Sequence, residues 1–128
     1  MKFRILIVDD HEVVRVGLRR ILDPMWEVCG EAANGREAID KALELKPDLI
    51  LMDLSMPLMD GMEAIRRIRK LGIPTIIVIL SLHDATDQTK QVGADAWLLK
   101  DASAEQLNKT MWGLLNPGTV SEARRSPR

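Results

Sequence analysis

Short apolar runs alternate with amphipathic segments along nearly the whole chain. The apolar runs have the length and residue types of buried strands. We expect these strands over Phe3–Val8, Trp26–Ala32, Asp48–Met52, Pro74–Leu80 and Ala94–Leu99. Between and after them, apolar residues recur at the spacing of one helix face. This pattern predicts helices over His11–Leu22, Gly35–Leu45, Gly61–Lys70 and Ser103–Leu115, and a weaker, more polar helix over His83–Gln91. Asn34 and Ser103 are expected to cap two of these helices, and Leu54–Asp60 is expected to be a loop.

The strict alternation of strands and helices indicates a parallel sheet with helices on both faces. Right-handed crossovers leave few topologies for such a sheet. We therefore expect an α/β, flavodoxin-like three-layer (βα)5 fold whose five-stranded parallel sheet has the order 2-1-3-4-5. Residues 1–115 are expected to form this domain, and the Pro, Gly, Ser and Arg content of 116–128 is typical of a linker or a disordered tail.

Composition narrows the class of protein further. A chain of 128 residues that is 46% hydrophobic and 29% charged fits one globular domain, and its net charge of −1 creates no strong field toward nucleic acid or a membrane. The apolar run after Arg4 is too short for a signal peptide or a membrane span. Cys29 is the single cysteine, which excludes an intramolecular disulfide. These features predict a cytoplasmic protein with no membrane partner.

Polar residues follow four of the five predicted strands. Asp9 and Asp10 follow the first, Asp53 the third, Ser81 the fourth and Lys100 the fifth. In the order 2-1-3-4-5 these four strands are neighbours, and parallel strands end at one edge of the sheet. Ligands bind at this edge in open α/β sheets, so we expect the five residues to converge there on one site.

The residue types at this edge indicate a particular chemistry. Three close carboxylates repel one another unless one holds a proton or a cation neutralises them. An all-oxygen ligand set selects a hard cation, with Mg²⁺ preferred to Ca²⁺ or Mn²⁺. The charge of Lys100 and the hydroxyl of Ser81 would then hold the oxygens of a transferring phosphoryl group. A carboxylate can itself act as the nucleophile and form an aspartyl phosphate.

Each of these residues also has a simpler interpretation. Asp9 and Asp10 could cap the first helix, and Ser81 could cap the helix that follows it. Lys100 taken alone would be a solvated loop lysine. His11, beside the acid pair, is expected to be a partly exposed surface residue.

Four stretches of the sequence resemble the receiver domain of two-component response regulators, of the subfamily usually joined to a LuxR-type helix-turn-helix. In chain order they are "ILIVDDH", "PDLILMDLSMPLMDG", "IIVILS" and "GADAWLLKD". The resemblance covers roughly Phe3 to Leu115.

This resemblance implies roles for individual residues. Asp53 would accept the phosphoryl group, and Lys100 would pair with the phosphoryl oxygens. Mg²⁺ would be bound directly by Asp10, Asp53 and the backbone carbonyl of Ser55, and mainly through water by Asp9.

The resemblance also implies a conformational switch. Ser81 would move to hydrogen-bond the phosphoryl group, and Trp97 falls where the family has its aromatic rotamer switch. That position is usually Tyr or Phe, and indole is larger and can only donate a hydrogen bond.

The implied function is a receiver that takes a phosphoryl group on Asp53 from a histidine kinase and switches a transcriptional output through the Ser81 and Trp97 face. It would not be an enzyme, apart from self-phosphorylation and slow self-dephosphorylation. A homodimer is left open as a partner. Because no helix-turn-helix follows residue 115, DNA is expected to be contacted only through an output domain outside this sequence.

Three alternatives remain. The first is a standalone receiver that acts through protein–protein contacts. The second is an Mg²⁺-dependent phosphohydrolase with an aspartate nucleophile, although such enzymes typically carry a second Asp two residues after the nucleophile, where this chain has Ser55. The third is a scaffold that is not phosphorylated, although such proteins usually lack part of the acidic site.

Overall fold

The computed structural model describes residues 2–82 and 92–117 of the 128-residue chain. The strands are β1 (Arg4–Val8), β2 (Glu27–Ala32), β3 (Leu49–Asp53), β4 (Ile76–Ser81) and β5 (Ala96–Leu99). The helices are α1 (Glu12–Leu22), α2 (Gly35–Leu45), α3 (Gly61–Lys70) and α5 (Ala104–Leu115). The helix predicted over His83–Gln91 lies outside the described residues, as does most of the tail predicted over 116–128.

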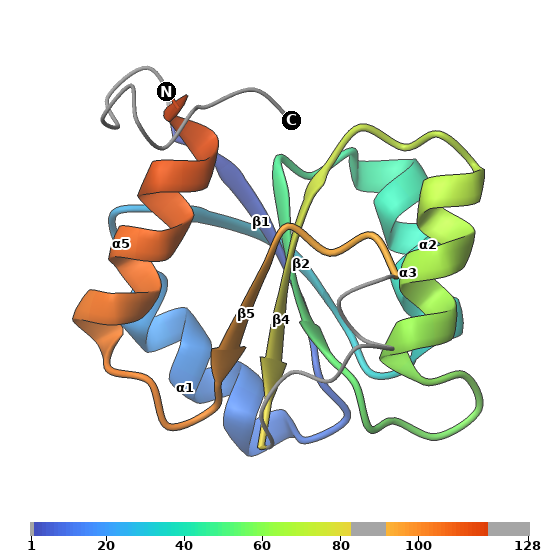
Figure 1. Cartoon of the computed structure of the whole chain (residues 1–128). Helices are drawn as coiled ribbons and strands as arrows, with labels where there is room; N and C mark the ends of the chain where they lie inside the picture. Colours follow the sequence, from blue (N-terminus) through green and yellow to red (C-terminus); the bar gives the residue numbers. More distant parts are fainter. Residues whose placement is uncertain (1, 83–91, 118–128) are drawn as a thin grey trace.

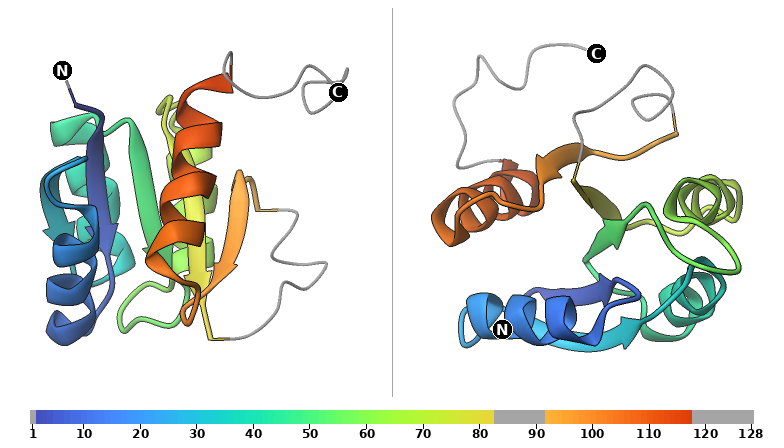
Figure 2. Two further views of the ribbon diagram at one scale, coloured as in Figure 1. Left: turned by 90° about the vertical axis from the view of Figure 1, so that its left-hand side faces the viewer. Right: turned by 90° about the horizontal axis from the view of Figure 1, so that it is seen from below.

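The five strands form one parallel sheet in the order β2-β1-β3-β4-β5, which confirms the predicted flavodoxin-like topology. The sheet runs through the middle of the molecule, with α1 and α5 on one face and α2 and α3 on the other (Figure 1). The carboxyl ends of the strands all lie at the lower edge of the sheet in that view, and the view from below looks onto this edge (Figure 2).

Each face of the sheet has its own apolar core. On the α2 and α3 face the strands contribute Leu6, Val8, Ile50, Met52, Ile77 and Ile79. On the α1 and α5 face they contribute Ile5, Ile7, Leu49, Leu51, Val78, Leu80 and Leu98. Successive residues of a strand point to opposite faces, so a strand covered on both sides must be apolar throughout. This explains why the predicted strands are continuous apolar runs.

Strand ends differ slightly from the prediction at the fourth strand. The apolar pattern predicts a start at Pro74, whereas β4 begins at Ile76. Proline has no N–H for the strand ladder. The amide of Thr75 donates to the carbonyl of Ile73 in a local turn, so pairing with β3 begins only at Ile76.

Helix starts follow the predicted capping chemistry. The side chain of Asn34 accepts a hydrogen bond from the amide of Glu37 at 2.9 Å, and Ser103 accepts from Gln106 at 3.0 Å. Asp60 caps α3 in the same way through Glu63, although the sequence pattern placed it only in a loop. Such caps satisfy amides that have no partner within the helix.

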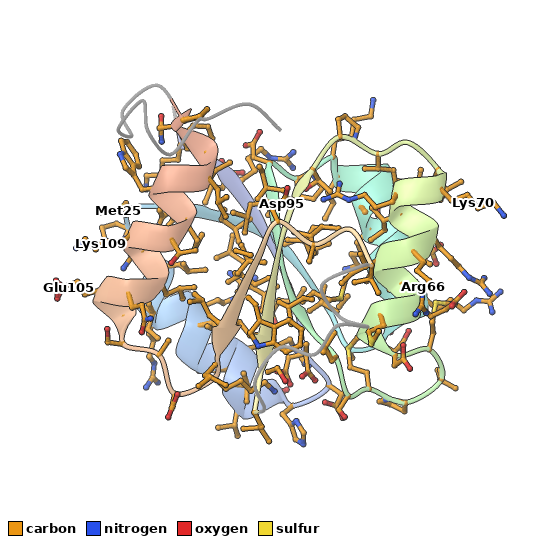
Figure 3. All side chains as sticks on the ribbon, in the orientation of Figure 1. Met25, Arg66, Lys70, Asp95, Glu105 and Lys109 are labelled. Atoms are coloured by element: carbon orange, nitrogen blue, oxygen red, sulfur yellow. The ribbon has the colours of Figure 1, made fainter. Side chains whose placement is uncertain are left out.

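Side chains are sorted between the layers and the surface. Charged side chains such as Arg66 and Lys70 on α3 and Glu105 and Lys109 on α5 point away from the sheet (Figure 3). Within the described part of the chain, no helix combines the length and the apolar character needed to cross a bilayer.

Candidate functional site

The polar residues at the carboxyl ends of the strands meet as predicted. We call Asp9, Asp10, Asp53, Ser81 and Lys100 the acidic rim. The Lys100 ammonium lies 2.8 Å from Asp9 Oδ2 and 3.1 Å from Asp53 Oδ1, so it joins the ends of β1 and β3 to the residue after β5. The amide of Lys100 donates to the carbonyl of Ser81 at 2.7 Å, which ties the end of β4 to the same place.

Lys100 is held between two carboxylates. Only 17% of its side chain is exposed. Burial opposes the charged ammonium, but the hydrogen bonds and charges of Asp9 and Asp53 outweigh it and raise the pKa of Lys100 above its usual value. A solvated loop lysine is therefore the wrong interpretation, and the cation is fixed within the site.

Asp53 is a buried carboxylate of the acidic rim. It is the last residue of β3 and is 5% exposed. Burial raises the pKa of Asp53, as do the charges of Asp9 and Asp10, and the hydrogen bond from Lys100 only partly offsets this. Among the described residues, Asp53 Oδ2 is buried and accepts no hydrogen bond. An acceptor in that state is costly unless a ligand serves it.

Asp9 is fully partnered. Its amide donates to the carbonyl of Ala32 at 3.0 Å, and its Oδ1 accepts from the amide of His11 at 2.9 Å. Its backbone carbonyl accepts from the guanidinium of Arg15 at 2.6 Å, and its Oδ2 binds Lys100. These bonds fix the position of the Asp9 carboxylate within the acidic rim.

The helix-capping interpretation of the acid pair is wrong. The N-cap residue of α1 is His11, and it makes no side-chain capping hydrogen bond. The side chain of His11 is 67% exposed, as expected, yet its Nδ1 lies 3.0 Å from Asp10 Oδ1 and 3.3 Å from Asp9 Oδ1. The imidazole therefore lies against both carboxylates.

The donor set of the acidic rim fits a divalent cation. Asp9, Asp10 and His11 each place one potential ligand atom within 4.8 Å of the others. Among the described residues, Asp10 Oδ1 and Asp53 Oδ2 are buried oxygens that accept no hydrogen bond. Ionised carboxylates offer only acceptors, so a cation, a proton or a hydrogen-bond donor such as water can satisfy them. Carboxylate oxygen ligands suit Mg²⁺, the cation that receiver domains generally bind at their acidic site.

Ser81 of the acidic rim and the two other predicted residues, Ser55 and Trp97, differ in burial. Ser55 is exposed in the loop after β3. Ser81 is buried at 8% exposure and ends β4. Trp97 lies on β5 opposite Ile79, is half-buried and packs on the α2 and α3 face.

Two residues near the site were not predicted from the pattern. Gly61 begins α3 where a Cβ atom would stand 2.1 Å from the carbonyl oxygen of Asp53, so only glycine lets the helix approach β3 this closely. Arg15 is half-buried one helical turn before Leu18, on the apolar face of α1. A charged residue on a buried stripe was the available signal for Arg15.

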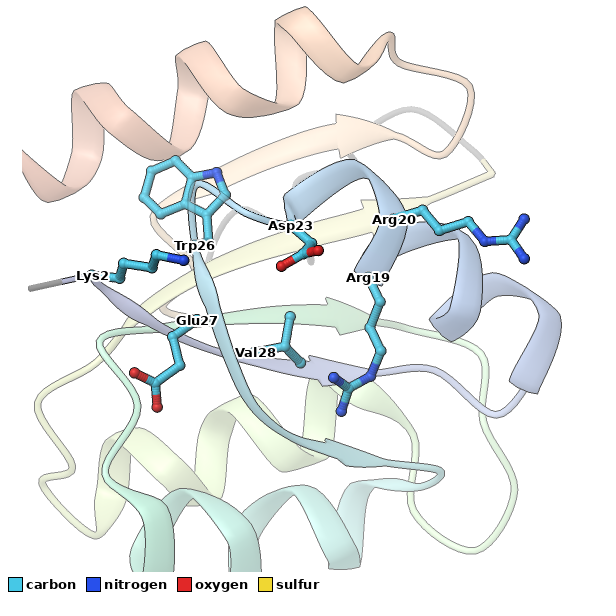
Figure 4. A pocket seen from close by; sticks show the side chains of 7 residues that line it. All are labelled: Lys2, Arg19, Arg20, Asp23, Trp26, Glu27 and Val28. Carbon is cyan, nitrogen blue, oxygen red and sulfur yellow. The ribbon is translucent and has the colours of Figure 1, made fainter.

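A surface cavity elsewhere in the molecule contains none of the acidic-rim residues. It has a volume of about 530 Å³ and lies beside α1 and β2 (Figure 4). Its lining comprises Lys2, Arg19, Arg20, Asp23, Trp26, Glu27 and Val28. Cations and carboxylates alternate around it, so its charges offer no clear preference for one ligand class.

Comparisons with known proteins agree with this geometry. Residues 5–111 match the family described as the response regulator receiver domain. The chain is 45% identical to the response regulator protein VraR of Staphylococcus aureus over 113 residues, which cover 84% of this chain and 54% of VraR. It is 40% identical to VraR of Staphylococcus saprophyticus over 129 residues, covering 96% and 61% of the two chains. The chain thus spans little more than half the length of these relatives.

Solved structures show the same fold. The receiver domain of the response regulator NarL from Mycobacterium tuberculosis superposes with a TM-score of 0.84 at 32% identity, over 90% of this chain and 97% of that one. A LuxR-family response regulator from Aurantimonas sp. SI85-9A1 gives the same TM-score and identity over 91% and 87%. A LuxR-family DNA-binding response regulator from Staphylococcus aureus gives 0.80 at 25%, over 89% and 99%.

Proposed function

The chain belongs to the response regulator receiver family, and from this premise we propose that it is a phosphorylatable switch with Asp53 as the phosphoryl acceptor. One observation carries the proposal. Asp53 is a buried carboxylate whose Oδ1 faces the Lys100 ammonium at 3.1 Å, while its Oδ2 accepts no hydrogen bond from the described residues. One oxygen is thus held against a fixed cation, and the other is an acceptor that a ligand can use.

The acidic rim would also hold the metal. We assign Mg²⁺ to Asp10, Asp53 and the backbone carbonyl of Ser55, with Asp9 acting mainly through water. The orphaned oxygens of Asp10 and Asp53 support this assignment. When bound, Mg²⁺ supplies positive charge that neutralises the carboxylates and the phosphoryl oxygens.

The remaining steps belong to the side chains of this chain. A carboxylate oxygen of Asp53 forms a bond to phosphorus as the phosphorus–nitrogen bond of a kinase phosphohistidine breaks. The electron pair of that bond stays on the imidazole, which takes up a proton. Lys100 is already placed against Asp53 and would hold a phosphoryl oxygen without reorganisation.

Phosphorylation would then be read at the ends of β4 and β5. We propose that the Ser81 hydroxyl turns to the phosphoryl group and that Trp97 responds as the aromatic switch. Ser81 and Trp97 lie on adjacent paired strands, which supports coupling between them. A local charge change would thus bias the segment between these strands.

The output and partners follow from the relatives. Receiver domains interact with histidine kinases, and we propose such a kinase as the phosphoryl donor for this chain. The LuxR-family relatives support a transcriptional output through a DNA-binding domain joined to the receiver by residues 116–128. We propose that the protein acts in the cytoplasm. Receivers are generally switches rather than enzymes, and we propose only self-phosphorylation and slow self-dephosphorylation as activities, with a homodimer as a further partner.

Incubation with acetyl phosphate or phosphoramidate and Mg²⁺, followed by intact mass spectrometry, tests the proposal. Wild-type protein should gain the mass of one phosphoryl group, and Asp53→Asn should gain none. No gain in the wild type, or a gain retained in the variant, would overturn the assignment of Asp53. Sustained turnover of p-nitrophenyl phosphate would instead favour a phosphohydrolase.

A further inference from the structure

Arg15 of α1 reaches the acidic rim from behind. Its guanidinium donates from Nη1 to the backbone carbonyl of Asp9 at 2.6 Å and from Nε to Glu31 Oε1 at 2.7 Å. Only 15% of its side chain is exposed. The fork of the guanidinium therefore binds one carbonyl after β1 and one carboxylate on β2 at the same time.

Glu31 fixes the guanidinium of Arg15 in this orientation. The second oxygen of the Glu31 carboxylate accepts from Arg19, one turn further along α1. Burial acts in the opposite direction, but the hydrogen bonds from Arg19 and Arg15 lower the pKa of Glu31. Glu31 thus stays charged and holds Arg15 through one hydrogen bond, whereas Arg19 shares the carboxylate without a hydrogen bond to the acidic rim.

The carbonyl that Arg15 binds belongs to the peptide between Asp9 and Asp10. This peptide is planar, so fixing its oxygen also fixes the position of the Asp10 nitrogen and Cα. Asp10 Oδ1 accepts no hydrogen bond from the described residues. Apart from the exposed His11 imidazole, whose Nδ1 lies 3.0 Å from this oxygen, the direction of the Asp10 carboxylate depends on its backbone.

We propose that Arg15 is a positioning residue for the cation site, because it sets the Asp9–Asp10 peptide and so aims the Asp10 carboxylate. The inference rests on the proposed function, in which Asp10 binds Mg²⁺. It extends that function to a side chain on α1 that contacts neither the metal nor the phosphoryl group.

The sign of the effect separates positioning from electrostatics. Arg15 is a cation near the acid pair, so its charge alone repels Mg²⁺. Removing the charge would strengthen Mg²⁺ binding if electrostatics dominated. Removing the hydrogen bond to the Asp9 carbonyl would weaken Mg²⁺ binding if positioning dominated, by about tenfold as for other groups that orient metal ligands.

The test is an Mg²⁺ titration of the whole chain, followed through backbone amide resonances in ¹⁵N-labelled protein. Arg15→Gln should raise the Mg²⁺ dissociation constant about tenfold and shift the Asp10 amide resonance before metal is added. Arg19→Gln is the matched control, because it removes a charge and a bond to Glu31 while leaving the Asp9 carbonyl bonded. It should leave the dissociation constant unchanged or slightly lower.

Arg15→Lys keeps the charge but cannot serve both acceptors with a planar fork, so it should also weaken Mg²⁺ binding. An unchanged or lower dissociation constant in either folded Arg15 variant would overturn the inference while leaving the proposed function intact. If Arg15→Gln does not fold, Arg15→Lys alone decides. Failure of the wild type to bind Mg²⁺ would overturn the proposed function and this inference with it.

Discussion

Strand β5 is bounded by two charged clusters that differ in how their charges are satisfied. Beyond its carboxyl end, Lys100 is shared by Asp9 and Asp53 in the acidic rim. Before its start, Arg69 donates to the carbonyls of Gly93 and Thr75 and to Asp95 Oδ2, all within 2.8 Å. We call this second cluster the Arg69 clip, and Asp95 lies at the end of β5 opposite the acidic rim (Figure 3).

The Arg69 clip is electrically balanced and satisfied. One cation meets one carboxylate, and Asp95 Oδ2 also accepts the amide of Ile77 at 2.8 Å. The acidic rim instead has one lysine against three carboxylates, an Asp53 whose pKa burial raises, and two orphaned oxygens. The comparison teaches that surplus charge and unmet acceptors, rather than an ion pair as such, mark the functional end of the sheet.

The largest expected effect is on phosphoryl transfer. Asp53→Asn keeps the shape of the side chain but removes the nucleophilic carboxylate, so phosphorylation by acetyl phosphate should be lost completely. Asp95→Asn makes the same change in the Arg69 clip and should leave the phosphorylation rate within about twofold of wild type. Intact mass measured over time checks both, and an Asp95→Asn variant as inactive as Asp53→Asn would break the comparison.

The next effect is on stability at the acidic rim. Lys100→Met leaves buried Asp9 and Asp53 without their shared cation, and we expect it to cost about 3 kcal/mol of unfolding free energy near neutral pH. The raised pKa of Lys100 means that its contribution is fully present below pH 10.5 and is lost as pH rises through the folded value. Urea denaturation measures the loss. Added Mg²⁺ should restore part of the lost unfolding free energy, because it neutralises the carboxylates. A loss that Mg²⁺ leaves unchanged would argue against repulsion between Asp9 and Asp53 as its cause.

A smaller effect is expected at the Arg69 clip. Arg69→Met removes three hydrogen bonds, but about a third of the side chain is exposed, so we expect a cost of about 1 kcal/mol. Arg67→Met is the control and should cost less, because among the described residues Arg67 pairs only with the neighbouring Glu63 at the helix surface. Urea denaturation measures the loss of unfolding free energy in Arg69→Met, and Mg²⁺ should not change that loss. A loss that depends on Mg²⁺ would contradict a purely structural role for the Arg69 clip.

The smallest expected effect is on the pH dependence of folding stability, which Asp53 alters at the acidic rim. Because burial raises the folded-state pKa of Asp53 above 3.8, ionisation of this group is less favourable in the folded protein. Its contribution to stability is fully present below pH 3.8 and is lost as pH rises through the folded value. Asp53→Asn cannot ionise, so without Mg²⁺ it should be more stable than wild type above that value, and the difference should close at acid pH. Thermal unfolding across pH checks this, and a variant less stable at neutral pH would contradict it.

Much of the fold could be predicted because its signals are local. The apolar runs gave the five strands and their order, and Asn34 and Ser103 were recognised as helix caps from neighbouring residues. Asp60 was missed as a cap because the motif that precedes it has the composition of a loop. The start of β4 was placed too early because hydropathy does not show where a partner strand begins to pair.

The candidate site divides in the same way. Asp9, Asp53 and Lys100 could be predicted to lie close together because each stands at a strand end. The distances from Lys100 to the two carboxylates confirm this prediction. Arg15 could not be assigned a role, because its partner is a backbone carbonyl, which every residue possesses. The chemical roles of the acidic-rim residues remain predictions that the variants above will decide.

The sequence by itself determined the alternation of strands and helices, the acids and the lysine at the strand ends, and the excess of negative charge there. These properties depend on residue type and spacing along the chain. Only the tertiary structure decided that Lys100 lies between Asp9 and Asp53, that Arg15 binds the Asp9 carbonyl, and that Asp53 Oδ2 is buried with no hydrogen bond from the described residues. These contacts join residues from separate strands and helices, and a hydrogen bond depends on atomic positions that packing alone sets.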